Sequence, residues 1–409
     1  MRTAVALDVL RMRDFRRVFA AAVVSLVGDG IVPVALTFAV LDLTGSATDL
    51  GLVLATGTVT LVGSLLFGGV VADRISRKPV MIGADLVRLV GQATIGALLI
   101  TGHAGVPAIA ASQGLLGAAT GFFNPASSGL LPAVAGERLQ QANALRGIAM
   151  AAGSIGGPAL GGVLVVTVGP GPALLIDAGT YGASALLLAG VRIGRPVGGR
   201  ARPSFLVDLR EGFSELRART WAWSIIAVAS FVNTIGIAFP VLGAVVAKES
   251  LGGAGAWAML LVARAIGLFA GGTILLRAEP RRPLLAAVPA CAAAALPLLL
   301  LAVAAPLALI AVAAAIAGLG AVVFNTLWET TLQQQVPARA RSRVSSYDWF
   351  GSLALQPLGY ALIGPLAQAL GVAGALYVCG GLELIAIAPL LAIRDIRRIS
   401  RPPPVTLAD

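Results

Sequence analysis

Charged side chains gather in one short stretch between two apolar runs, from Gly68 to Pro79. A single carboxylate, Asp73, lies there among three cations, with glycines before it. Glycine allows two helices to approach closely at a membrane edge. A carboxylate held among cations can change partners when helices slide, as a gate on one membrane face requires. The gate residues are therefore expected to be Gly69, Asp73, Arg74, Arg77 and Lys78. The alternative is an ordinary basic loop that only sets topology.

A second candidate for chemistry is a carboxylate inside the first apolar run. Asp29 lies near the middle of that run, between Gly28 and Gly30. A charge in such a place costs at least a few kcal/mol and is a functional candidate by default. A poorly solvated carboxylate there can take up and release a proton when its surroundings change. The alternative is a hydrogen-bonded carboxylate that only supports helix packing.

Other charges inside or beside apolar runs complete the candidates. Glu329 follows Asn325 by four residues, so the two share a helix face, where Glu329 can meet a substrate or proton or lie at the membrane interface. Arg264 needs an anion, which Asp29 or Glu383 can supply. Asp348 is a further proton-coupling candidate. Asp177, near the start of its run, is interpreted as a helix-start carboxylate favoured by the helix dipole.

Twelve apolar runs must position these residues. Hydrophobic residues make up 57% of the chain and charged residues only 12%, whereas soluble domains carry roughly a quarter charged residues. The runs are each about twenty residues or longer, enough for a membrane helix. They cover 19–41, 50–71, 80–101, 106–123, 142–168, 173–191, 222–247, 256–276, 284–304, 307–327, 344–370 and 373–393. The fold predicted is an all-α membrane protein with two bundles of six helices.

A polar stretch divides the runs into two sets of six. We expect an N-terminal bundle at residues 1–193, a cytoplasmic linker at 194–220, and a C-terminal bundle with a short cytoplasmic tail at 221–409. The linker piece 205–216 has apolar residues at helical spacing, typical of a helix on the membrane surface or a solvated helix. Phe123-Asn124 recurs as Phe324-Asn325, about two hundred residues later, so the halves form a parallel repeat.

The distribution of the basic residues decides what the net charge of +11 means. They cluster in segments separated by two runs each, and Lys248 is the clear exception in the alternate loops. This is the positive-inside pattern, which places both termini in the cytoplasm of a multi-pass protein in the cell (inner or plasma) membrane. A nucleic-acid partner is not expected, since its binding face would gather the charge on one folded surface.

No constellation for catalysis, metal binding or a cofactor is expected. His103 is the single histidine, and Cys291 and Cys379 lie far apart in apolar runs, so metal-ligand spacing is lacking. The glycine-rich stretches lack the Gly-Lys-Ser/Thr ending of a phosphate-binding loop. We therefore expect neither an enzyme nor a chain that uses ATP by itself.

The gate stretch resembles the loop signature of the major facilitator superfamily, Gly-x-x-x-Asp-Arg-x-Gly-Arg-Lys/Arg, between the second and third helices. The five gate residues match it, and Ser76 stands where the pattern usually has glycine. The second half keeps arginines in the corresponding loop without the aspartate. Asp85 and Arg88 lie one or two turns inside the same membrane face, so they are expected to join the gate.

A glycine-rich run in the fifth apolar segment adds a second resemblance. It is similar to the Gly-x-x-x-Gly-Pro-x-x-Gly-Gly pattern of antiporter-type members of the superfamily. The alternative is tight helix packing without a functional direction, because glycines remove bulk where helices cross. The matching residues are Gly153, Gly157, Pro158, Gly161 and Gly162.

Further short matches, among them Asp85-Leu-Val-Arg88 and Phe123-Asn-Pro-Ala126, resemble the drug-exporting branch with macrolide and siderophore exporters. That resemblance implies a central cavity lined by the first, fourth, seventh and tenth helices, alternating access, and exchange for protons. The residues expected to line the cavity are Phe123, Asn124, Phe231, Asn233, Asn325 and Trp328.

An apolar cavity wall with a few amides suits a hydrophobic or amphipathic small molecule better than a sugar. We therefore expect a monomeric multidrug-type antiporter whose partners are this substrate, protons and membrane lipids. The alternatives are a uniporter or importer of the same fold, or a non-transporting membrane protein that binds a lipid or a partner.

The predicted topology has a direct test by labelling. The Arg74–Lys78 loop should face the cytoplasm and His103 the outside. Cysteines introduced as Ser76→Cys and His103→Cys should react with a membrane-impermeant reagent from opposite sides of the membrane. Labelling of both from one side would overturn the assignment of the spans.

Overall fold

The computed structural model describes residues 8–74, 76–192, 213–278, 280–337, 344, 347–348 and 350–400, without the side chains of 8, 66 and 68–75. Throughout these residues the regular structure is helical, with no strand. The all-α prediction is confirmed. The linker helix expected at 205–216 falls mostly outside the described residues.

Ten helical stretches among the described residues are long and apolar enough to cross a membrane. Two of them, Val106–Val168 and Phe350–Ala392, contain 63 and 43 residues. At 1.5 Å per residue these would reach about 95 and 65 Å, far beyond a hydrocarbon core of about 30 Å. Each is interrupted at a glycine with positive φ, Gly136 (53°) or Gly371 (72°), and each covers two of the twelve predicted runs. The number twelve stays a prediction.

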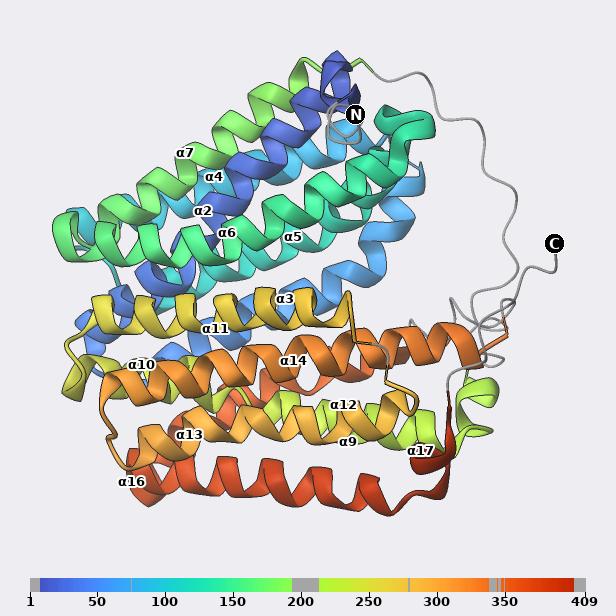
Figure 1. Ribbon diagram of the computed structural model, residues 1–409. Helices are drawn as coiled ribbons and strands as arrows, with labels where there is room; N and C mark the ends of the chain where they lie inside the picture. Colours follow the sequence, from blue (N-terminus) through green and yellow to red (C-terminus); the bar gives the residue numbers. More distant parts are fainter. Residues whose placement is uncertain are drawn as a thin grey trace. The chain divides into compact units, whose positions relative to one another are not determined.

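The chain forms two compact units. Unit 1 comprises Met1–Arg200, Val241–Val262 and Tyr360–Leu366; unit 2 comprises Ala201–Pro240, Ala263–Gly359 and Ala367–Asp409. Each unit is built from long helices (Figure 1). The bundle boundaries predicted at residues 193 and 221 stay a prediction, since most of the intervening linker lies outside the described residues.

Unit 1 contains α2 (Arg13–Thr44), α3 (Ala47–Arg74), α4 (Arg77–Ile100), α5 (Val106–Ala135), α6 (Leu139–Val168) and α7 (Pro170–Ala189). Helix α2 packs against α6 and α7, α4 packs against α5 and α7, and α3 packs against α5 (Figure 1). Part of α10 (Ala238–Ser250) and part of α11 (Ala254–Leu275) belong to the same unit. Helix α7 therefore lies between α2 and α4, where the polar residues gather.

Unit 2 contains α9 (Thr220–Ile235), α12 (Pro283–Cys291), α13 (Ala295–Ala302), α14 (Leu307–Gln335) and most of α16 (Gln356–Ile387). Its apolar core includes Trp221 of α9 and Trp328 of α14, whose ring centroids are 5.7 Å apart in an edge-on arrangement. Such aromatic pairs add about 0.5–1.5 kcal/mol beyond the area they bury. This contact joins α9 to α14.

Helices α2 and α6 approach so closely that only glycine fits at their crossing. A Cβ atom added to Gly157 would lie 2.5 Å from Cα of Gly30, and one added to Gly30 would lie 2.6 Å from Cα of Gly157. One turn on, a Cβ at Gly161 would lie 3.0 Å from the carbonyl oxygen of Ile31. The glycine run of α6 thus packs on α2 beside Asp29.

The remaining residues of this run differ in what they contact. Gly153 lies near Leu26 of α2, and Pro158 is buried inside α6. Gly162 points instead at Ala258 of α11, within unit 1, where an added Cβ would lie 2.4 Å from the alanine Cβ. The run therefore packs on two helices.

Substitution of Gly157 should separate α2 from α6. In Gly157→Ala the new methyl group meets backbone atoms, which cannot rotate away, so we expect a loss of roughly 1–3 kcal/mol of stability, as overpacking usually costs. The measurement is thermal unfolding of the purified protein in detergent. Gly156→Ala is the matched control, because it changes the same residue type in the same helix with nothing within 4 Å. Equal effects of the two substitutions would contradict the close crossing.

Candidate transport site

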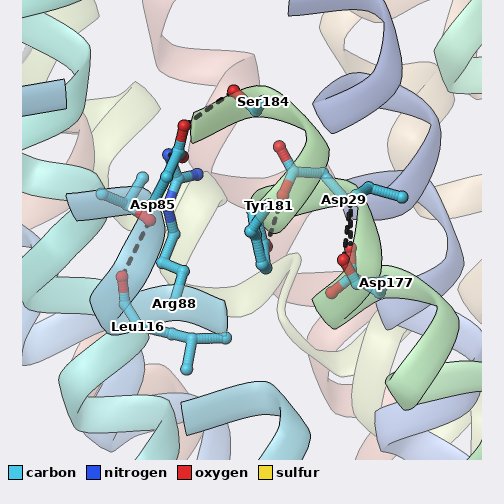
Figure 2. A network of polar contacts seen from close by, with 9 residues as sticks. Asp29, Asp85, Arg88, Leu116, Asp177, Tyr181 and Ser184 are labelled. Carbon is cyan, nitrogen blue, oxygen red and sulfur yellow. Dashed lines mark hydrogen bonds and ion pairs between the residues drawn. The ribbon is translucent and has the colours of Figure 1, made fainter. Parts of the chain in front are cut away.

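A buried ion pair lies within α4. The Arg88 guanidinium donates to Asp85 Oδ1 at 2.6 Å, and the two side chains are 3% and 0% exposed. Ser184 of α7 donates its hydroxyl to the other oxygen, Asp85 Oδ2, at 2.7 Å (Figure 2). Both carboxylate oxygens are therefore satisfied, as a charge removed from water requires.

Two aromatic rings hold the other side of the Arg88 guanidinium. The ring of Phe123, from α5, lies 4.2 Å from the guanidinium carbon, and the ring of Tyr181, from α7, lies 4.6 Å from it. Aromatic faces attract cations, most strongly where water is excluded. Phe123 was expected to line a substrate cavity; in this structure it contacts Arg88.

Asp29 is joined to the same network through α7. The hydroxyl of Tyr181 donates to Asp29 Oδ1 at 2.6 Å. Tyr181 is 3% exposed, whereas Asp29 itself is exposed although it lies in the interior of α2. Asp29 is thus held from α7 by a hydrogen bond.

Asp177 is not a helix-start carboxylate, and that interpretation was wrong. Helix α7 begins at Pro170, so Asp177 lies two turns inside it, where the dipole of the helix end no longer acts. The side chain is fully buried and faces α2, since a Cβ at Gly28 would lie 2.3 Å from Asp177 Oδ1. Figure 2 shows Asp177 and Asp29 on facing helices.

The described part of the predicted gate binds backbone carbonyl oxygens. Lys78 donates to the carbonyl oxygens of Ala189 and Val191 at 2.7 and 2.8 Å, and Arg17 donates to that of Gly190 between them. Cations are favourable at a helix C-terminus, where carbonyl groups lack partners. Arg77 donates to the carbonyl oxygen of Gly129, which lies inside α5 and not at its end.

The remaining gate residues cannot be placed in this network. Gly69, Asp73 and Arg74 lie near the end of α3, and their side chains fall outside those described. Asp85 and Arg88 were expected to join the gate. Their described partners are Ser184, Phe123 and Tyr181, so the structure groups these two residues with Asp29.

The candidates in unit 2 are more dispersed. Trp328 is 5% exposed and donates its indole N–H to Asp348 Oδ2 at 3.0 Å. Glu329 is exposed and accepts from Gln333 at 3.3 Å. Glu383, fully buried, is the carboxylate whose charge acts on Arg264, and the Arg264 guanidinium carbon lies 5.6 Å from the centre of the Phe239 ring.

The expected amide residues are exposed. Asn325 donates to the carbonyl oxygen of Ala321 in its own helix at 2.9 Å, and Asn233 donates to that of Ser352 at 3.3 Å. Asn124 is exposed in α5, and Phe231 is 42% exposed in α9. Whether these side chains line one cavity stays a prediction.

Three residues of the network were missed at the level of sequence: Tyr181, Ser184 and Gln92. Asp177, Tyr181 and Ser184 follow one another at spacings of four and three, which places three polar groups on one face of a membrane helix. That spacing was the available signal. Gln92 offered none.

Lys248, the exception to the basic-residue pattern, also has an explanation within unit 1. Its ammonium group lies 2.7 Å from Asp42 Oδ1 and donates to the carbonyl oxygen of Leu41 at 2.6 Å. These groups lie at the C-terminal end of α2, where a cation is favourable.

The sequence of the chain is similar to a known family and to known exporters. Residues 18–353 match the Major Facilitator Superfamily. The enterobactin exporter EntS of Escherichia coli O1:K1 is 30% identical over 411 residues, covering 97% of this chain and 95% of the relative. The enterobactin exporter EntS of Salmonella typhimurium strain LT2 is 29% identical over 407 residues, covering 96% and 95%.

Solved structures with the same fold include more distant transporters. A peptide transporter POT mutant superposes with a TM-score of 0.77 at 13% identity, covering 95% of each chain. The nucleoside transporter NupG superposes with a TM-score of 0.74 at 13% identity, covering 94% of this chain and 99% of its own. At such identities the likeness concerns the fold.

The ion pair of α4 should behave as a buried pair. Arg88→Gln leaves Asp85 as an uncompensated charge and should cost roughly 3–5 kcal/mol of stability, and the added change Asp85→Asn should restore part of it. Thermal unfolding of the two single variants and the double variant measures this coupling.

A partly exposed ion pair provides the control for this test. Arg219 and Glu215 are 2.7 Å apart with side chains 20% and 28% exposed, so Arg219→Gln should cost about 0–1 kcal/mol. Additive effects of Arg88→Gln and Asp85→Asn would show that the two residues do not depend on each other.

Proposed function

The chain belongs to the Major Facilitator Superfamily, and from this premise we propose that it exports a hydrophobic or amphipathic small molecule across the cell membrane in exchange for protons. The observation that carries the direction of transport is the similarity to enterobactin exporters over nearly the whole chain. Enterobactin is therefore the first compound to test as a substrate.

Proton exchange is proposed from the position of Asp29. Its carboxylate is exposed inside a membrane helix and accepts from Tyr181, while its electrostatic partner Arg88 is already bound by Asp85. A carboxylate couples proton and substrate when its protonation differs between the two states of the cycle. Asp29 can meet both a proton and a substrate, because it alone of the three network carboxylates is exposed.

Alternating access is proposed to involve the charged loop between α3 and α4. Arg77 donates to a carbonyl oxygen within α5 and Lys78 donates to carbonyl oxygens at the end of α7, so movement of these helices must break or exchange those bonds. Asp73 is proposed as the partner that the cations take up in another state. Both termini are proposed to lie in the cytoplasm, and the working unit is proposed to be a monomer.

The variant Asp29→Asn separates coupling from binding. It should abolish accumulation of enterobactin driven by a pH gradient, because the amide cannot carry the exchanged proton, while binding and downhill exchange persist. Uptake into proteoliposomes with and without the gradient measures the first, and binding to the purified protein measures the second.

A carboxylate at a helix start serves as the control. Asp49→Asn, in the first turn of α3, should leave gradient-driven accumulation unchanged. Uphill transport at the normal rate by Asp29→Asn would exclude Asp29 from the coupling mechanism and leave Glu329 or Asp348 as the candidates.

The unmodified protein distinguishes the alternative functions. Transport at the same rate with and without the pH gradient would indicate a uniporter, and absence of any transport would indicate a protein that only binds.

A further inference from the structure

Asp177 is a buried carboxyl group that the proposed mechanism does not yet use. It is fully buried in α7, and its Oδ1 accepts only a long hydrogen bond of 3.3 Å from Thr180 of the next turn. The other oxygen, Oδ2, has no hydrogen-bond partner among the described residues. The close approach of α2 at Gly28 leaves no free space beside Oδ1.

Gln92 is a second buried polar side chain at this place. This side chain of α4 is fully buried, and neither its amide nitrogen nor its amide oxygen has a partner among the described residues. It nevertheless faces Asp177 closely enough to act on the carboxyl group. A buried amide without partners is costly, whereas an amide beside a carboxyl group can donate its N–H to the carboxyl oxygen.

The charges that act on Asp177 come from two of the helices that pack on α7. Helix α2 contributes Asp29, which has the same sign, and α4 contributes Arg88, which Asp85 already binds at 2.6 Å. Tyr181, on α7 itself, donates to Asp29. Helix α6 also packs on α7, and no described charge on it acts on Asp177.

Charge balance therefore distinguishes the three carboxyl groups of the network. Arg88 neutralises Asp85, and Asp29 accepts from the Tyr181 hydroxyl, a hydrogen bond that favours its ionised form. An ionised Asp177 would be buried without a free cation and beside a second negative charge, which is the least favourable arrangement of the three.

We propose that Asp177 is a proton-binding site, at which a neutral carboxylic acid accepts at its carbonyl oxygen from the Gln92 amide N–H while Asp29 is the ionised member of the pair. Its part in transport rests on the proposed proton exchange. Asp29 is the exposed member, so a proton leaves Asp177 by passing as H⁺ to the Asp29 carboxylate. The charge of the pair is unchanged by this step, and no other reactant is needed.

Infrared spectroscopy of the purified full chain tests the protonation without any substrate. The unmodified protein at neutral pH should show the carbonyl stretch of a protonated carboxylic acid. Asp177→Asn should remove that band. Glu383→Gln is the control, because Glu383 is also fully buried and neither of its oxygens has a hydrogen-bond partner among the described residues. This substitution should leave the Asp177 band in place.

A second variant keeps the test decisive if Asp177→Asn fails to fold. In Gln92→Leu the acid loses its hydrogen-bond partner, so the band should move to higher frequency. A band that survives Asp177→Asn or does not move in Gln92→Leu overturns the proposal. The transport assay tests a separate proposal. Uphill pumping by Asp29→Asn would refute the proposed proton coupling, whereas the infrared assignment of Asp177 would still hold.

Discussion

Arg88 donates to Asp85 at 2.6 Å with almost no solvent on either side chain, and without that carboxylate the guanidinium would be an isolated charge in hydrocarbon. The pair needs more than its own two members. Ser184 satisfies the second oxygen of Asp85, and the rings of Phe123 and Tyr181 receive the guanidinium. Three helices, α4, α5 and α7, thus have to meet at this point.

Because Arg88 is committed to Asp85, the other two carboxyl groups of the network must be accommodated by different means. Asp29 accepts a hydrogen bond from the Tyr181 hydroxyl and is exposed. Asp177 is fully buried and lies beside the amide of Gln92. The close crossing of α2 and α6 at Gly30 holds this part of α2 in place one residue from Asp29. Helix packing and the placement of charge therefore depend on each other here, because the glycines that allow the crossing also fix the position of the neighbouring carboxylate.

Much of this protein was determined by the sequence alone. Apolar runs of about twenty residues have one common solution in a membrane, since a helix satisfies its backbone internally. The all-α class and the positions of most helices follow from that rule. The motifs between Gly69 and Lys78 and between Gly153 and Gly162 indicated the superfamily, which the comparison over residues 18–353 confirms. Asp29 could be chosen as a candidate because a charge within an apolar run is conspicuous in the sequence.

Only the tertiary structure decided which polar groups meet. Asp177 belongs to the apolar run at 173–191, and its position near the start of that run suggested a helix cap, but the helix begins at Pro170 and turns the side chain toward Gly28. Asp85 and Arg88 lie close to the charged loop along the chain, yet their described partners come from α5 and α7. The physical reason is that a membrane helix can be rotated about its axis without changing its hydropathy. The sequence therefore specifies that a helix spans the membrane, whereas packing against its neighbours specifies which side chains face one another.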